Sequence, residues 1–416
     1  MGGMQDTELY RHLLGLTAPW TVARVELSVD SQRVDVFAEH ASQVEWACPE
    51  CGRKLGLYDH SDERAWRHLD SCQFETYLHA RPPRIRCPEH GVRQVRLPWA
   101  EDRARFTAMF ERLAIDVLRE MDVAGAMRVL GISWDEAWHI LERAVRRGLL
   151  AKKQRSCRLI GVDETAAARG HKYITVVCDL EHGTVEYVGE DRRWESLATY
   201  YAGLTDEQLT SIEAVAMDMW DPYIKATRER VPDWENKVVF DRFHVMQQLG
   251  DAVDTVRKEE HRALKAVGDD SLTGSKYAWL YSNENRPERY EEKFAALQAM
   301  NLKTGRAWAL KENLRELWSY KRRSSAERHW KHWYRWATHS RLKPILKAAK
   351  TVKLHLQNIL TFFTHRITNA LSESLNGKIQ RLKRAAHGYR NVENFKTAIF
   401  FHCGGLQLYP HTHGIP

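Results

Sequence analysis

Two short cysteine motifs in the first quarter of the chain place the strongest limit on what it can fold into. CPEC holds Cys48 and Cys51, CPEH holds Cys87 and His90, and two residues separate the ligands in each. This spacing lets both side chains of a turn point into one tetrahedral metal site, and the glycine after each motif permits a tight turn. A closed four-ligand site makes the metal structural. The pattern therefore predicts a zinc ribbon, with buried structural cysteines as the alternative.

The residues around these motifs predict how the ribbon is built. Strand-like segments at residues 74–78 and 84–87 are expected to form its hairpins, and Cys72 is the spare thiol. Many arginines lie nearby, and such a density suits either contacts with DNA or an ordinary solvated surface. They are Arg64, Arg67, Arg81, Arg84, Arg86 and Arg93.

Composition limits the class of protein. A length of 416 residues allows two to four domains, and 43% hydrophobic with 28% charged residues is ordinary for a globular chain. The net charge of +8 favours a polyanionic partner, although a solvated basic surface gives the same total. No apolar stretch approaches the roughly 18–20 residues of a membrane span. We therefore expect a cytoplasmic protein that makes no membrane contact.

A helix-turn-helix pattern follows the cysteine motifs. Apolar residues recur at helical spacing from Phe106 onward, one helix ends near Leu130, Gly131 breaks it, and Ser133 caps the next helix. The second helix would enter the major groove of DNA. Any helical hairpin with a glycine turn looks similar. The residues expected to contact DNA are Arg143, Arg146 and Arg147.

Three acidic residues stand where apolar strands are expected to end. Asp163 ends the first strand of a β-meander, Asp218 ends a later strand before a helix opened by Asp221 and Pro222, and Asp241 ends a third strand. Carboxylates gathered in this way are typical ligands of Mg²⁺. For any one of these acids taken alone, a helix cap or salt bridge is the alternative.

A helix near the C-terminus carries a polar face. Asn369, Glu373, Asn376 and Gln380 recur three or four residues apart and therefore share a side of the helix. Basic residues follow and would bind phosphate beside the carboxylate. They are Lys378, Arg381, Lys383 and Arg384.

The long stretch between Asp241 and Glu373 predicts a helical insertion. It is rich in lysine, arginine, glutamate and tryptophan. Its RHWKHWYRW segment interleaves Trp330, Trp333 and Trp336 with basic residues. Spacing of three favours packing of these rings against another helix, and stacking on unpaired bases is the alternative.

Taken together, these motifs resemble bacterial insertion-sequence transposases of the ISL-three family over nearly the whole chain. The carrying motifs, in order, are CPEC, CPEHG, GVDE with GHKY, MDMWDPY, FDRFHV, TNALSESLNGKIQ and HGYRN. The resemblance implies an α/β, RNase H-like catalytic domain that uses a DDE mechanism. It also implies a zinc ribbon and a helix-turn-helix that read the ends of the element, and a homodimer or higher oligomer on DNA.

The resemblance also assigns roles to residues. Asp163 corresponds to the first acid and Glu373 to the last, while Asp218 is preferred over Asp241 as the middle acid. Asp241 and His244 then form an auxiliary motif, and Asn376 and Lys378 are further auxiliary candidates. Glu164 should point away from Asp163, because neighbouring strand residues face opposite sides.

We therefore predict a zinc-ribbon domain over residues 1–100, a helix-turn-helix domain over 101–152 and the first part of the catalytic domain over 153–248. A helical insertion covers 249–365, and the last catalytic helix and tail cover 366–416. The predicted protein binds the terminal repeats of an insertion sequence and cuts and transfers double-stranded DNA with two Mg²⁺ or Mn²⁺ ions, beside one structural Zn²⁺. The alternatives are a nuclease or resolvase on the same fold and a non-catalytic DNA-binding regulator. A zinc hydrolase is disfavoured, because the chain lacks the paired histidines of a catalytic zinc site.

Overall fold

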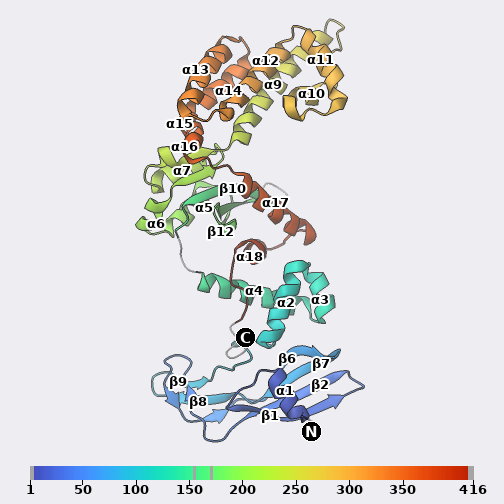
Figure 1. Cartoon of the computed structure of the whole chain (residues 1–416), viewed down its shortest axis with the longest axis vertical. Helices are drawn as coiled ribbons and strands as arrows, with labels where there is room; N and C mark the ends of the chain where they lie inside the picture. The colour runs from blue at the N-terminus through green and yellow to red at the C-terminus, as the bar shows by residue number, and fades with distance from the viewer. Residues whose placement is uncertain (1–3, 153–155, 169–171, 411–416) are drawn as a thin grey trace. The chain divides into compact units, whose positions relative to one another are not determined.

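The computed structural model describes residues 4–152, 156–168 and 172–410. These residues form two compact units (Figure 1). The first contains the described residues between Met1 and Lys153 together with those from Phe400 onward. The second contains those between Gln154 and Ile399. Gly170 and His171 of the GHKY motif lie outside the described residues.

The first unit contains a four-stranded sheet that no sequence motif predicted. Its strands are β1 (Trp20–Ser28), β2 (Arg33–His40), β7 (Phe74–Ala80) and β6 (Arg64–Ser71), in the order β1-β2-β7-β6. Strands β2 and β7 run parallel and the other pairs antiparallel, and α1 (Asp6–Leu13) lies beside β1. The segment predicted at 74–78 is thus a strand, but it belongs to this sheet and not to the zinc ribbon. The reason is burial, since Leu78 packs in a core with Trp20 and Trp66.

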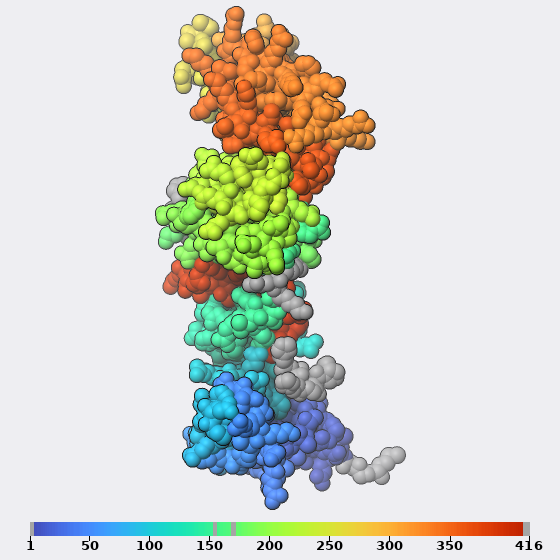
Figure 2. All heavy atoms as spheres, turned by 90° about the vertical axis from the view of Figure 1, so that its left-hand side faces the viewer, coloured from blue at the N-terminus to red at the C-terminus, as the bar shows by residue number. Residues whose placement is uncertain are grey.

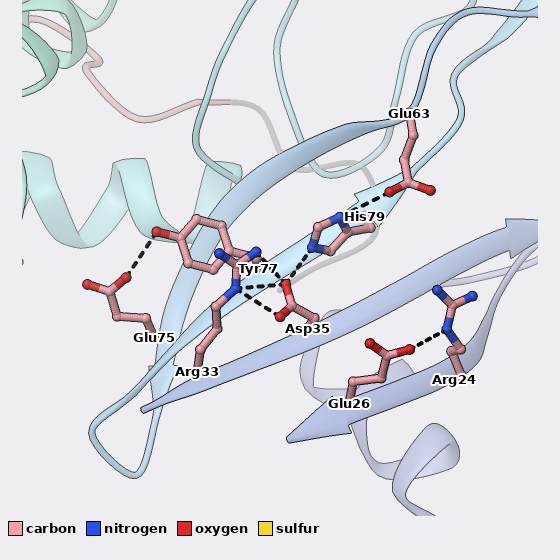
Figure 3. Close-up of polar contacts among 8 residues, drawn as sticks. All are labelled: Arg24, Glu26, Arg33, Asp35, Glu63, Glu75, Tyr77 and His79. Atoms are coloured by element: carbon pink, nitrogen blue, oxygen red, sulfur yellow. Dashed lines mark hydrogen bonds and ion pairs between the residues drawn. The ribbon is translucent and has the colours of Figure 1, made fainter. Parts of the chain in front are cut away.

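The two faces of this sheet differ in character. Alternate residues of β2, such as Val34 and Val36, are buried, because side chains along a strand point to opposite faces. The other face carries charged and polar side chains that pair with one another: Arg33 Nη2 lies 2.6 Å and His79 Nε2 lies 2.5 Å from Oδ1 of Asp35. Figure 3 shows this face through Arg24, Glu26, Arg33, Asp35, Glu63, Glu75, Tyr77 and His79.

The ribbon itself uses short strands. They are β3 (Trp46–Ala47), β4 (Lys54–Leu55), β5 (Asp59–His60), β8 (Pro83–Cys87) and β9 (Gly91–Gln94). Strand β3 pairs with β4, and the remaining three form a sheet in the order β5-β8-β9. Gly52 and Gly91 have φ of 74° and 70°, the left-handed conformation that the expected tight turns need.

Three helices follow the ribbon, namely α2 (Ala108–Glu120), α3 (Val123–Leu130) and α4 (Trp134–Ala151). The predicted turn is confirmed: Gly131 is left-handed, and Ser133 and Glu136 form a reciprocal capping box at the start of α4. The end of the chain also belongs to this unit, because Tyr409 donates a hydrogen bond to Asp116 of α2 over 2.5 Å. The predicted segment 366–416 is therefore shared between the two compact units, with the residues from Phe400 onward in the first.

The second unit is built on a five-stranded sheet. Its strands are β10 (Leu159–Ala168), β11 (Lys172–Asp179), β12 (Thr184–Glu190), β13 (Ala214–Met217) and β14 (Val238–Phe240), in the order β12-β11-β10-β13-β14. The first three form the expected antiparallel meander, and β13 and β14 run parallel to β10. The helices between them are α5 (Trp194–Ala202), α6 (Asp206–Ser211), α7 (Asp221–Arg230) and α8 (Trp234–Lys237).

Strand β10 does not end at Asp163, as the sequence suggested. Asp163 pairs with Val176, and pairing with β11 continues as far as Ala168. The polar residues after Asp163 belong to the same strand, because one antiparallel partner satisfies their backbone groups. The helix after Asp218 does begin at Asp221, with Pro222 in its first turn, as predicted.

A helical insertion follows β14. Its helices are α9 (Arg242–Lys265), α10 (Lys276–Leu280), α11 (Glu291–Ala299), α12 (Lys303–Arg315), α13 (Arg323–His339), α14 (Lys343–Leu354), α15 (Leu356–Leu360) and α16 (Phe362–His365). They are coloured from yellow-green to orange-red in Figures 1 and 2. Helix α9 starts at Arg242, so the predicted boundary at 248/249 falls inside one continuous helix.

Most of the tryptophans of α13 lie in the hydrophobic core of this insertion. Trp333 is 1% exposed and donates from Nε1 to the carbonyl of Leu310 on α12 over 2.7 Å, and the ring of Trp330 packs beside it at a tilt of 32°. Trp336 is 45% exposed. Packing is therefore the observed role of the first two rings, in line with the favoured prediction.

Two helices follow, α17 (Ala370–Ala385) and α18 (Val392–Cys403); α17 belongs to the second unit, and the boundary between the units falls within α18. Helix α17 lies against β10 (Figure 1). None of the helices in the described ranges is both long and apolar enough to cross a bilayer.

Candidate active site and metal centre

The four predicted zinc ligands lie together in the first unit. The ligand atoms of Cys48, Cys51, Cys87 and His90 all fall within 4.8 Å of one another. The two Sγ atoms of Cys51 and Cys87 are 3.8 Å apart, and His90 Nδ1 lies 3.5 Å from Cys87 Sγ and 3.9 Å from Cys48 Sγ. A tetrahedron with Zn–S near 2.3 Å and Zn–N near 2.0–2.1 Å has edges of about 3.5–3.8 Å. The spacing therefore fits a four-coordinate zinc ion.

The electrostatics at these ligands also suit a metal. The hydrogen bond from His90 is the main cause that lowers the pKa of the Cys87 thiol to about 6. A thiolate is the form that binds zinc. Cys72 is exposed and lies in the turn between β6 and β7, so it is the spare thiol as expected.

Two of the three arginines expected to contact DNA are used inside the first unit. Arg143 is hydrogen-bonded to Glu111, and Arg147 donates to both carboxylate oxygens of Glu101 over 2.6 and 2.8 Å. The side chain of Arg147 is 10% exposed, and Glu111 is buried. Such buried pairs hold helices together, and they leave these guanidinium groups turned away from solvent. Arg146, by contrast, is exposed.

The arginines around the ribbon are largely engaged as well. Arg84 makes a two-point contact with Asp59 over 2.6 and 2.5 Å, and Arg86 donates to the hydroxyl of Tyr58 over 2.6 Å. Arg67 is buried and lies 2.5 Å from Asp70. The contacts of Arg84 and Arg86 lie within the ribbon, and that of Arg67 lies within β6 of the four-stranded sheet.

In the second unit, Asp163 lies on β10 with its carboxylate held from two sides. Oδ1 accepts a hydrogen bond from the backbone N–H of Glu164 over 2.7 Å, and Oδ2 accepts one from Asn376 Nδ2 over 2.6 Å. Burial, followed by the negative charge of Asp218, raises the pKa of Asp163 to about 7. A nearby cation stabilises the ionised form of a carboxyl group in this setting.

Asp218 follows β13 directly and faces the first turn of α9. His244 Nε2 lies 2.8 Å from its Oδ1. This contact is the main cause that raises the pKa of His244, which therefore carries a proton more readily than a free histidine.

Asp241 follows β14 and caps α9, because its Oδ1 accepts a hydrogen bond from the backbone N–H of Phe243 over 2.8 Å. Burial is the main cause that raises its pKa. The pKa of Glu373 on α17 is also raised, first by burial and then by the charge of Asp241. The two carboxyl groups therefore lie near enough to each other to interact.

The three expected acids and both auxiliary residues of α9 are thus brought to one region. Ligand atoms of Asp218, Asp241 and His244 lie within 4.8 Å of one another, while Asp163 and Glu373 interact electrostatically with this group. Mutual repulsion among carboxylates is relieved by a divalent cation, and oxygen ligands are those that Mg²⁺ prefers. The donor set fits such an ion.

Helix α17 is held tightly against β10. Gly161 makes this possible, because a Cβ atom there would lie 2.1 Å from Oγ of Ser372 and 2.8 Å from Cδ2 of Leu180. Gln380 binds the hydroxyl of Thr165, and Lys383 Nζ donates to the carbonyl of Ala166 over 2.5 Å. The predicted polar face of this helix therefore turns toward β10, and Lys383 anchors the helix instead of pointing to solvent. Lys378, Arg381 and Arg384 are exposed.

Glu164 follows Asp163 on β10, and the alternation of strand residues predicts that it points to the other face of the sheet. Its carboxylate accepts a hydrogen bond from Arg192 Nη1 over 2.9 Å. Even so, it lines the same cavity of about 220 Å³ as Asp218, His244 and Trp220. The sequence analysis missed Arg192, which stacks over Trp220, because only the fold brings the segment after β12 to this place. Trp220 itself stands two residues after Asp218, and that position was a usable signal.

Comparison with known proteins identifies the family. A family model described as a transposase matches residues 160–399, which include all the acids of the site. The zinc-finger of transposase IS204/IS1001/IS1096/IS1165 matches residues 45–90, and the helix-turn-helix domain of transposase family ISL3 matches residues 95–145. The chain belongs to transposase family ISL3.

Two curated transposases are similar to this one along most of their length. The transposase for insertion sequence element IS1557 of Mycobacterium tuberculosis is 28% identical over 423 residues, which cover 94% of each chain. The transposase for IS1001 of Bordetella parapertussis is 26% identical over 397 residues, or 94% of this chain and 97% of the relative. The predicted family, zinc ribbon and helix-turn-helix domain are therefore confirmed, and the four predicted zinc ligands of this transposase lie within the matched zinc-finger region.

Proposed function

We propose that the second unit is an RNase H-like nuclease and strand-transfer domain in which Asp163, Asp218 and Glu373 hold two Mg²⁺ or Mn²⁺ ions. The observation that carries the proposal is the convergence of acids from β10, from the end of β13 and from α17 on one region. The strand order β12-β11-β10-β13-β14, with β11 antiparallel to a parallel β10-β13-β14 group, supports the fold assignment.

The reaction follows from the family and the donor set. Water attacks the phosphodiester at the end of the element, and the P–O3′ bond breaks to leave a 3′ hydroxyl and a 5′ phosphate. That 3′ hydroxyl then attacks a phosphodiester in target DNA, whose own P–O3′ bond breaks and releases a target 3′ hydroxyl. When bound, the metal ions lower the pKa of the attacking group and stabilise charge on the phosphate. No covalent link to the protein is needed.

The residues of the chain position these groups. Asn376 orients Asp163, and His244 orients Asp218. One carboxylate oxygen of Asp241 accepts the hydrogen bond that caps α9, which supports a structural role for this residue. The same contact favours Asp218 as the middle acid. The exposed basic side chains of Lys378, Arg381 and Arg384 suit contacts with the DNA backbone.

The binding part of the proposal concerns the first unit. Helix α4 would enter the major groove at the terminal repeats of the element, with the exposed Arg146 near its end on a phosphate. Two or more chains would assemble on the DNA, since two ends must be joined to one target.

The test compares Asp163→Asn, Asp218→Asn, Asp241→Asn and Glu373→Gln with the parent chain. Each is incubated with a labelled duplex carrying the element's own end and with Mg²⁺ or Mn²⁺, and binding is measured in parallel. We expect losses of at least about 100-fold in cleavage for Asp163, Asp218 and Glu373 with binding retained. Glu207→Gln, an exposed change on α6, is the matched control and should cut normally.

The same four variants distinguish the proposed function from its alternatives. Activity that survives Asp218→Asn and fails in Asp241→Asn would move the middle acid to Asp241. Cleavage without joining of the 3′ end to a target plasmid would indicate a nuclease. Cleavage indifferent to all four substitutions would refute the carboxylate site.

A further inference from the structure

A groove runs beside the carboxylates, along the first turns of α9. It has a volume of about 630 Å³, within the roughly 300–1,000 Å³ range of ligand pockets. Asp241 and Glu373 line one part of it, and Phe243, Met246 and Leu280 give it an apolar wall. We call it the α9 groove. It therefore joins the acids to an apolar surface within one cavity.

Phe243 is the unusual residue of this groove. Its side chain is 60% exposed, although Val245 and Leu249 on the same helix are buried in the core. Its backbone N–H is fixed to Asp241, and its ring packs edge-on against His244 at 5.4 Å between centroids. This exposed aromatic ring beside the acids is available to a ligand, because it is not buried in the core of the insertion.

Asn369 gives the groove a polar atom that accepts no hydrogen bond from the described residues. It lines the groove and is 1% exposed, and its Oδ1 has no hydrogen-bond partner among the described residues. A buried amide oxygen without a partner is costly, so a ligand that supplies a donor would be stabilised there. The side-chain amide offers both a donor and an acceptor.

We infer that the α9 groove binds one unstacked nucleobase of the DNA strand beside the bond that is cut. The base stacks on Phe243, and Asn369 binds its edge. This inference rests on the proposed function, since it needs DNA at Asp241 and Glu373. Two features favour a nucleotide over an apolar peptide: the groove is continuous with the carboxylate site, and the exposed Arg242 next to Phe243 places a cation for the adjoining phosphate.

The test uses the full chain and duplexes of the element's end with 2-aminopurine at single positions on either side of the cleaved bond. Unstacking of that base raises its fluorescence, and the reaction is followed in Ca²⁺ for binding and in Mg²⁺ for cleavage. For the parent chain we expect the signal at one position only. Phe243→Ala should reduce the signal and slow cleavage about 5- to 150-fold, the range that one base-stacking contact supplies.

Rescue distinguishes a binding role from a folding role. An abasic site at the responding position removes the base that must be unstacked, so it should restore cleavage by Phe243→Ala toward the parent rate. Phe243→Tyr keeps a ring and should behave like the parent, and Leu354→Ala, an exposed apolar change on α14, is the control. Thermal unfolding should be unchanged in Phe243→Ala, because the side chain is exposed.

The outcomes separate this inference from the proposed function. Asp163→Asn should lose cleavage and keep the fluorescence signal, since it alters the acid site and leaves the groove intact. A parent chain that cuts in an Asp163-dependent manner without any fluorescence change would overturn the groove inference alone. So would Phe243→Ala cutting and signalling like the parent.

Discussion

Asn376 on α17 donates a hydrogen bond to Oδ2 of Asp163 on β10 over 2.6 Å. The two residues are 213 positions apart in the chain, and the bond fixes the helix that carries Glu373 against the strand that carries the first acid. Geometry at a metal site of this kind depends on partners that orient the ligands.

We therefore expect Asn376→Leu to lower metal-dependent cleavage about 10- to 100-fold, the usual cost of losing an orienting partner. Binding to the terminal duplex should stay within about twofold of the parent value. Ser374→Ala, an exposed change on the same helix, is the control. Equal cleavage rates for Asn376→Leu and the parent would show that the hydrogen bond does not orient Asp163 during catalysis.

Gly161 should be intolerant of any side chain. A Cβ atom there would meet Ser372 and Leu180, so Gly161→Ala is expected to push α17 away from β10. Overpacking of this kind costs about 1–3 kcal/mol of unfolding free energy, and cleavage should fall further than stability explains. Gly56→Ala, where a Cβ meets nothing within 4 Å, should change neither quantity in urea unfolding and cleavage assays.

The ribbon should contain one zinc ion per chain. Cys48→Ser or His90→Ala is expected to lose that zinc and unfold the ribbon, because a small metal domain takes much of its folding free energy from the ion. Elemental analysis of the purified chain measures the stoichiometry, and circular dichroism follows the folding. Cys72→Ser should keep its zinc. A chain that stays zinc-loaded after Cys48→Ser would require a different ligand set.

Arg147 and Arg146 should behave differently although they are neighbours. Arg147→Ala leaves the buried Glu111 without one of its cations, removes the contact with the part-buried Glu101, and is expected to destabilise the first unit by about 3–5 kcal/mol. Arg146→Ala should leave unfolding unchanged, weaken DNA binding, and reduce the slope of log affinity against log salt by about 1. Chemical denaturation and binding at several salt concentrations test both. If Arg147→Ala instead weakened DNA binding without changing unfolding, Arg147 would be a DNA-contacting residue.

Asp163 should make folding stability depend on pH when the divalent site is empty. Its pKa is raised to about 7 by burial and by Asp218, so the folded state binds a proton that the unfolded chain has released above its pKa of about 3.9. This contribution is present below the unfolded pKa and is lost as the pH rises through 7. Between pH 5 and pH 8 the loss should amount to about 1–3 kcal/mol.

Urea unfolding in buffer free of magnesium and manganese measures this change. Asp163→Asn should remove it, because an amide does not titrate in this range. Asp218→Asn should move the loss to lower pH, because it removes the second cause of the raised pKa. A parent chain whose stability is flat from pH 5 to pH 8 would mean that Asp163 titrates normally.

Local patterns in the sequence were sufficient for much of this protein. The paired motifs at Cys48 and Cys87 gave the metal module, since ligand spacing within a turn is a local property. The turn at Gly131 and Ser133 gave the helix-turn-helix for the same reason. The meander and the start of α7 were likewise predictable from turn residues and apolar runs.

Only the tertiary structure decided which side chains meet. The sequence marked Arg143 and Arg147 as free cations, and burial against Glu111 and Glu101 turned them into internal pairs. The sheet of β1, β2, β6 and β7 carried no motif, and its pairing joins segments far apart in the chain. The sequence by itself determined which residues can bind metal, cap helices or line a core, because those are properties of residue type and local spacing. The contacts of Asn376 with Asp163 and of Arg192 with Glu164 depend on long-range packing, and no local pattern specifies them.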